Sequence, residues 1–181
     1  MEIEIPMGYK VKWVNGVLTL VHEKKKDNRP VAERIKTFDD AVEELGNGHP
    51  LCVHYFEIYD NFLFEGGNEV ADVVAFLKLR IIVAALNEGW VPTPKDSGYS
   101  PEFMFHTADE MKAMADDDIP SFMHVLEPKF DVDLVTVSCP CATVLHSGSC
   151  MLLRTPETAI YCGQQFIDIW MDYLLPIKEN D

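Results

Sequence analysis

The chain opens with two runs of β-type residues that meet at a turn. Residues 9–14 and 17–22 flank Asn15-Gly16. An Asn-Gly pair between two such runs predicts a β-hairpin, because both residues tolerate the positive φ angles of a two-residue turn. The sequence Asp-Asn-Arg-Pro at 27–30 breaks the pattern and is typical of a linker. We therefore expect a hairpin or arm over residues 1–30 and a single domain over residues 31–181.

Four later segments carry apolar residues at spacings of three and four, together with helix end signals. The longest is apolar on all sides at Ile81-Ile82-Val83, which predicts the central core helix, and Gly89 predicts its end. The predicted helices run from Thr37 to Gly46, from residue 69 to residue 88, from Thr107 to about Met114, and from Thr155 to about Leu174. In the last of these, the expected buried stripe is Ala159, Gly163, Phe166, Ile167, Trp170 and Leu174.

Short β-type runs lie between these helices. Residues 101–106 predict a strand, and four further runs separated by turn residues predict a small antiparallel meander. Those four runs are Phe122–Leu126, Leu134–Ser138, Thr143–His146 and Met151–Arg154. The apolar, aromatic stretch Leu51–Phe56 fits either a helix or a strand. The order of helices and strands predicts an α+β fold.

Charge restricts the partners that the chain can bind. Its 181 residues contain 15 Lys and Arg against 30 Asp and Glu, a net charge of −15. Residues 1–36 carry a net charge of +3, and the remaining 145 residues carry −18. We expect the N-terminal lysines to be a solvated edge of the hairpin, with nucleic-acid contact as the alternative. For the acidic body the balance argues against nucleic acid and anionic lipid.

Compartment and membrane association also follow from composition. No apolar run is long enough to span a membrane, and the acidic start, Met1-Glu2-Ile3-Glu4, is unlike a secretory signal. The five cysteines are an odd number, which favours reduced thiols. We expect a cytoplasmic protein that does not bind membranes.

The most reactive group of side chains lies in residues 139–150. Cys139, Cys141, His146 and Cys150 are a thiolate and imidazole set that could bind zinc. Cys139-Pro140-Cys141 leaves only one residue between the paired cysteines, which is fewer than structural zinc sites use. In an extended strand Cys139 and Cys141 would share one face, as metal ligands or as small core residues. A thiol nucleophile with His146 or His124 as its base is a further alternative.

Other catalytic signatures are missing from the sequence. Ser147-Gly148-Ser149 lacks the Gly-x-Ser-x-Gly pattern of serine hydrolases. Neither the Gly-x-x-x-x-Gly-Lys phosphate loop nor the Gly-x-Gly-x-x-Gly dinucleotide pattern occurs. The sequence therefore favours a protein without catalytic residues and without a cofactor.

Three stretches resemble a group of small uncharacterised proteins that phages and prophages of gut Bacteroidetes encode. They are residues 34–41 (Arg-Ile-Lys-Thr-Phe-Asp-Asp-Ala), residues 77–92 with Leu86-Asn87-Glu88-Gly89-Trp90, and residues 158–170. The resemblance covers about residues 34–174 and implies a phage-type accessory protein, but no activity or catalytic residue. Where that family has Gly-Ser-Arg, this chain has Gly148-Ser149-Cys150, so the arginine is absent.

The resemblance and the helix signals both single out Asn87, Glu88 and Trp90. At a helix end, an Asn side chain can cap carbonyls and a Trp can pack back on the helix. The alternative is a binding site, because helix ends and loops commonly carry function.

Two classes of function follow from the sequence. The first is a non-catalytic phage or prophage accessory protein that binds a protein partner through its acidic surface. The alternative is a small metal- or ligand-binding protein that uses Cys139, Cys141, His146 and Cys150, with hydrolysis or ligand sequestration as its activity.

Overall fold

The computed structural model describes residues 9–14, 17–22, 27–65, 70–115, 118–127, 129–130, 133–145, 150–175 and 177. The chain divides into two compact units, residues 1–30 and residues 31–181.

The first unit is the predicted hairpin. Strand β1 (Tyr9–Val14) pairs antiparallel with β2 (Val17–His22), and Val14 lies opposite Val17. The predicted turn residues, Asn15 and Gly16, lie outside the described residues, as do the side chains of the hairpin lysines.

The second unit is an α+β domain, which confirms the predicted fold class. Its helices are α1 (Val31–Arg34), α2 (Phe38–Leu45), α3 (Pro50–Glu65), α4 (Ala71–Leu86), α5 (Ala108–Ala113), α6 (Pro156–Gln165) and α7 (Ile167–Leu174). Its strands are β3 (Gly98–Thr107), β4 (His124–Val125) and β5 (Leu134–Leu145), in the antiparallel order β3-β5-β4. None of the described helices combines the length and the apolar character needed to cross a membrane.

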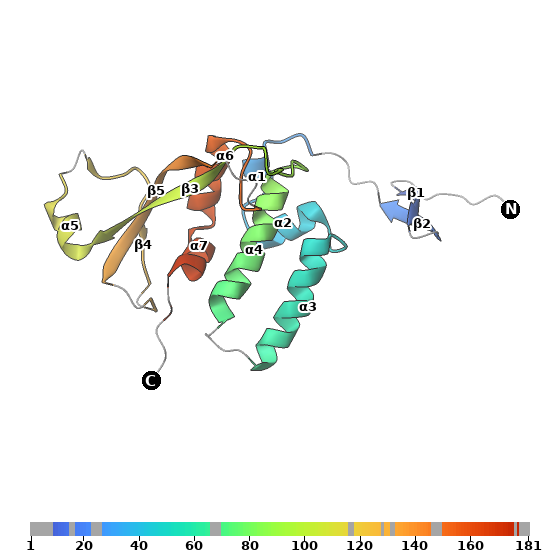
Figure 1. The fold of residues 1–181 in the computed structure, drawn as a ribbon, viewed down its shortest axis with the longest axis horizontal. Helices are drawn as coiled ribbons and strands as arrows, with labels where there is room; N and C mark the ends of the chain where they lie inside the picture. Colours follow the sequence, from blue (N-terminus) through green and yellow to red (C-terminus); the bar gives the residue numbers. More distant parts are fainter. Residues whose placement is uncertain are drawn as a thin grey trace. The chain divides into compact units, whose positions relative to one another are not determined.

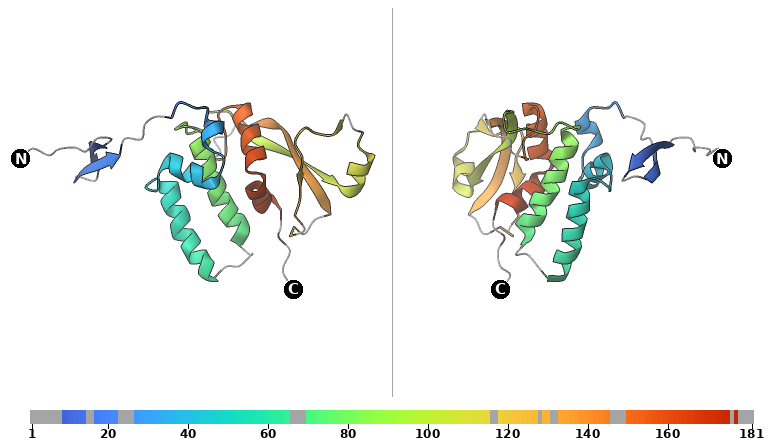
Figure 2. Two further views of the ribbon diagram at one scale, coloured as in Figure 1. Left: turned by 180° about the vertical axis from the view of Figure 1, so that it is seen from behind. Right: turned by 45° about the vertical axis from the view of Figure 1, so that its right-hand side comes forward.

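The domain is layered. Within it, α2 and α3 pack on α4, α4 packs on α7, and α6 packs on β3 and β5 (Figure 1). The views in Figure 2 show the same order, with α4 between α3 and the α6–α7 pair, and the sheet beyond that pair. Helix α4 is the predicted core helix, because Leu79, Ile81 and Ile82 are completely buried.

Local end signals placed most helices correctly. Thr37 and Thr107 each accept a hydrogen bond from the backbone three residues later, in capping boxes completed by Asp40 and Glu110. Thr155 caps α6 in the same way, ahead of Pro156. Residues 51–56, whose type the sequence left open, belong to α3.

The predicted small antiparallel sheet is confirmed, but its strands do not have the extents expected for the four short runs. Residues 134–145 form one continuous strand, β5, because β3 pairs with it along most of its length. Residues 124–125 are the only part of 122–126 in a strand, and residues 151–154 contribute only a bridge between Leu153 and Tyr99. The length of each strand is therefore set by its pairing with a strand distant in the sequence and not by the local β propensity of its residues.

The C-terminal helix is also shorter than predicted. It breaks at Phe166, whose φ of −113° and ψ of 31° are not helical, so α6 and α7 are separate helices. Trp170 packs on Phe103 of β3, with 5.4 Å between the ring centroids. Leu174 is 43% exposed, so the last position of the predicted buried stripe is wrong.

Candidate functional site

The end of α4 is held by the side chain of Asn87. Its Nδ2 donates to the carbonyl oxygen of Leu152 at 2.8 Å, and its Oδ1 accepts from the backbone N–H of Arg154 at 3.1 Å. The residue is 5% exposed. The sequence suggested that this amide caps its own helix. Instead, the amide joins the end of α4 to the segment that leads into α6.

The residues after Asn87 also have structural contacts. Glu88 and Glu44 both bind the guanidinium of Arg34, whose side chain is only 6% exposed. Glu88 and Gly89 have positive φ angles of 48° and 88°, which turn the chain sharply after α4. Trp90 lies against Gly98, where an added Cβ would be 3.2 Å from the Trp90 ring.

Helix α6 secures the same region from the other side. The Tyr161 hydroxyl lies 2.9 Å from the carbonyl oxygen of Ala32 and 2.6 Å from that of Ile35. We call the set Arg34, Asn87, Glu88, Leu152 and Arg154 the junction. Among the described residues its buried polar groups have partners, which is the arrangement of a structural connection and not of an open binding site.

The Cys-Pro-Cys sequence lies at a β-bulge. The register pairs Glu102 with Cys141 and Met104 with Ser138, so Cys139 and Pro140 together oppose the single residue Phe103. The bulge accommodates a proline in the central strand of the sheet, where it could not otherwise contribute a ladder hydrogen bond.

The bulge also separates the two cysteines. Cys139 is completely buried below Gly163 of α6, whereas Cys141 is exposed beside Glu102. The expectation that Cys139 and Cys141 share one face is therefore wrong, because the extra residue shifts the alternation of the strand by one position.

The environment of these thiols opposes thiolate formation. Burial raises the pKa of Cys139 to about 11. Desolvation by its surroundings and the neighbouring Glu102 carboxylate raise the pKa of the exposed Cys141 thiol above its ordinary value. A zinc ligand or a nucleophile needs a thiolate, which these surroundings disfavour at neutral pH.

The remaining predicted ligands do not complete a site within the described part of the chain. Cys150 is exposed, and His146 lies outside the described residues. Among the described residues no three His, Cys, Asp or Glu side chains are placed to hold a metal ion. His124, considered as a base, instead contacts Asp168 at 3.0 Å and connects β4 to α7.

A site that the sequence did not indicate lies on the sheet. One face of the sheet, the inner face, packs on α6. Figures 1 and 2 show α6 and α7 on this one side of the strands. On the opposite side of the sheet, β3 and β5 place four cross-strand pairs: Ser100 with Thr143, Glu102 with Cys141, Met104 with Ser138, and His106 with Thr136. Thr136 also pairs with Val125 of β4. We call these nine residues the outer face.

The outer face combines exposed apolar side chains with buried polar atoms. Met104 is 47% exposed and Val125 is 73% exposed. His106 is 7% exposed and Ser138 is completely buried, yet His106 Nε2, Ser138 Oγ and the neighbouring Thr136 Oγ1 have no partner among the described residues. Buried polar atoms without partners are rare in folded proteins, so this group calls for an explanation.

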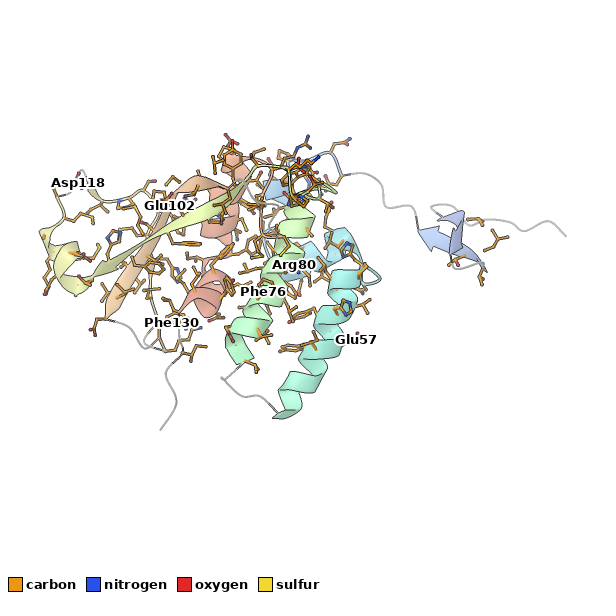
Figure 3. The ribbon with its side chains drawn as sticks, in the orientation of Figure 1. Glu57, Phe76, Arg80, Glu102, Asp118 and Phe130 are labelled. Carbon is orange, nitrogen blue, oxygen red and sulfur yellow. The ribbon has the colours of Figure 1, made fainter. Side chains whose placement is uncertain are left out.

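Acidic residues are concentrated in the part of the sequence that contains β3, α5 and β4. Residues 102–133 contain nine Asp and Glu and two Lys. Both lysines are already paired: Lys112 contacts Asp109 at 3.0 Å, and Lys129 contacts Asp172 at 2.9 Å and Glu127 at 3.1 Å. Glu102 and Asp118 lie on the sheet side of the domain, away from Glu57 on α3 (Figure 3).

The local sequence contained a weak signal for this face. Glu102, Met104 and His106 alternate with Phe103 and Phe105, which is the period-two pattern of a half-exposed strand. The partners from β4 and β5 could not be assigned without the register.

Comparison with known proteins adds no family to this description. Searches of protein-family models, of curated proteins and of solved structures found no match to the chain.

Proposed function

We propose that this chain is a non-catalytic accessory protein of the phage or prophage type, acting in the host cytoplasm by binding a protein partner through its acidic surface. The resemblance of residues 34–41, 77–92 and 158–170 to phage-encoded proteins supports the accessory role. The net charge of −15 supports a partner with a basic surface.

One observation carries the proposal. Within residues 102–133 nine acidic residues stand against two lysines, and both lysines already contact acids. Uncompensated like charges repel one another within a fold and are relieved when a surface of the opposite sign is bound. A complementary partner therefore gains both steering and stabilisation.

The site chemistry favours binding over catalysis. Both cysteines of the bulge have raised pKa values, and His124 is engaged with Asp168. A nucleophile adjacent to an oriented base is the usual signature of covalent catalysis, and the described side chains do not provide one.

A sharper form of the proposal is nucleic-acid mimicry. Carboxylates would then take the place of phosphates, and the partner would itself be a nucleic-acid-binding protein. Such a complex weakens steeply as salt rises, because few basic contacts persist when the charges are screened.

The test is affinity capture with the tagged chain from lysate of a Bacteroidetes host, at low and at high salt, followed by mass spectrometry. The expected result is a defined partner with a basic surface that is lost at high salt. Competition by duplex DNA for that partner would support mimicry. A partner bound equally at both salt concentrations would overturn the acidic-surface proposal.

A further inference from the structure

We propose that the outer face of the sheet is the docking surface, and that its occupant is a protein segment in which Lys or Arg residues flank an aliphatic residue. This inference rests on the proposed function and deepens it, because it names the surface and the chemistry of the partner.

The first support is the incomplete cover of this sheet. Helix α6 packs on β3 and β5 from one side, and the described helices leave Met104 and Val125 exposed on the other. An antiparallel sheet can present one face to water, but that face is then usually polar. Here each of the two edge strands carries an exposed apolar side chain on this face, and exposed apolar side chains are common in protein-binding surfaces.

The second support is charge. Glu102 lies directly beside Met104 and Ser138 in the ladder, and α5 places Asp109 and Glu110 at the end of the same strand. A Lys or Arg side chain can lay its methylene groups on Met104 and Val125 while its charged end meets these acids. An acidic segment would add like charge beside these carboxylates, and a purely apolar segment would remove water from them without supplying an opposite charge.

The third support is the unpartnered polar group. Ser138 Oγ and Thr136 Oγ1 can accept hydrogen bonds, as can an unprotonated His106 Nε2, and none of the three has a partner among the described residues. Met104 is the cross-strand neighbour of Ser138. A methionine side chain repacks easily, so docking can move it and bring N–H donors to these atoms.

A second surface provides the comparison. Val53 and Phe56 of α3 are 39% and 41% exposed, and Glu57 lies beside them. Residues 50–59 contain no buried polar side-chain atom without a partner. The α3 surface therefore shares the apolar and acidic character of the outer face but not its unsatisfied acceptors.

The experiment measures binding of two synthetic peptides of equal charge to the full chain by fluorescence anisotropy. One peptide alternates lysine pairs with leucine, and the other replaces leucine by serine. Three proteins are compared with the parent: Glu102→Lys/Asp118→Lys on the sheet side, Glu43→Lys/Glu57→Lys on the helical side, and Val125→Thr. The first two change the net charge equally.

We expect the leucine peptide to bind more tightly than the serine peptide and to weaken with salt. Glu102→Lys/Asp118→Lys should weaken it about tenfold and Val125→Thr about threefold, with little effect of the helical-side pair. Backbone amide signals of Met104, Val125 and Ser138 should shift on binding. Circular dichroism and the unfolding midpoint show whether each variant is folded.

The outcomes separate this inference from the proposed function. Equal weakening by both charge pairs, or amide shifts confined to α2 and α3, would overturn the outer face as the site while leaving an acidic-surface function intact. A dimer of the parent chain that Val125→Thr dissociates would overturn the basic partner in favour of a second copy. No salt-dependent binding of either peptide would overturn both proposals.

Discussion

The junction and the outer face differ in whether their buried polar groups have partners. At the junction, Asn87 satisfies two backbone groups and Arg34 joins two carboxylates, all in the interior or at its rim. On the outer face, His106, Thr136 and Ser138 leave polar atoms without partners beside exposed Met104 and Val125. The contrast indicates that the motif most distinctive in the sequence stabilises the fold, whereas the surface proposed for binding is one that no motif marks.

The largest expected effect is at the junction. Asn87→Leu keeps the branched shape and the number of heavy atoms of the side chain but removes both hydrogen bonds, leaving the Leu152 carbonyl and the Arg154 N–H without their partner. We expect the free energy of unfolding to fall by about 3 kcal/mol, measured by urea denaturation. Asn47→Leu, at an exposed loop position, is the matched control and should change it little. A loss below about 1 kcal/mol at Asn87 would contradict the role given to the junction.

Features that depend on a few neighbouring residues were predicted from the sequence. Thr37 with Asp40, Thr107 with Glu110, and Thr155 all mark real helix starts, because a cap is satisfied within one turn. The core helix ends at Leu86, shortly before the predicted stop at Gly89, whose positive φ belongs to the turn that follows. These interactions involve only residues that are close together in the chain, so they can be recognised in the sequence itself.

Features set by distant pairing were not predicted. Residues 134–145 are one strand because β3 lies along them, and Pro140 is tolerated because a bulge falls at that point. That bulge decides that Cys139 is buried and Cys141 exposed, which removes the shared face assumed for a metal pair. The outer face depends on the same register, and so could not be assembled from the sequence.

The inner face of the sheet gives the next largest effect and sharpens the contrast with the outer face. An added Cβ at Gly163 would lie 2.4 Å from Cys139 Sγ and 2.8 Å from Pro101 Cβ. Gly163→Ala should therefore lower the free energy of unfolding by about 2 kcal/mol through overpacking. In a double-mutant cycle, Cys139→Ala should recover part of this loss, because it removes the sulfur but leaves Pro101. If the two changes in the free energy of unfolding were simply additive, the contact between the added Cβ and Cys139 Sγ would not be the cause of the loss.

Alkaline pH probes the same buried thiols. Burial raises the pKa of Cys139 to about 11 and that of Cys162 to about 12, above the value of an unfolded thiol. As the pH rises, the thiols of the unfolded chain therefore lose their protons before those of the folded chain. The stability that these buried thiols contribute is fully present below the pKa of the unfolded thiol, and it is lost as the pH rises toward the pKa of the folded thiol. We expect each thiol to lower the free energy of unfolding by about 1 kcal/mol within one pH unit above the unfolded pKa.

The alkaline prediction is measured as a difference. Unfolding curves of the parent and of Cys162→Ala are compared at neutral pH and above pH 9, where the variant should lose less stability than the parent. Iodoacetamide labelling is the companion measurement, and it should modify Cys141 and Cys150 in the native state while sparing Cys52, Cys139 and Cys162. Native labelling of Cys139 would contradict its burial.

The smallest expected change in the free energy of unfolding is on the outer face. It separates the two regions most clearly, because removing a polar group there should not destabilise the fold, whereas at the junction it should. Ser138 is completely buried and its Oγ has no partner among the described residues, so Ser138→Ala removes a desolvated hydroxyl and no hydrogen bond. We expect the free energy of unfolding to stay within about 0.5 kcal/mol of the parent or to rise. If the hydroxyl contributes to docking, the same variant should bind the lysine–leucine peptide more weakly while being no less stable. A loss of stability as large as that of Asn87→Leu would instead show that Ser138 has a structural partner, and the outer face would then resemble the junction.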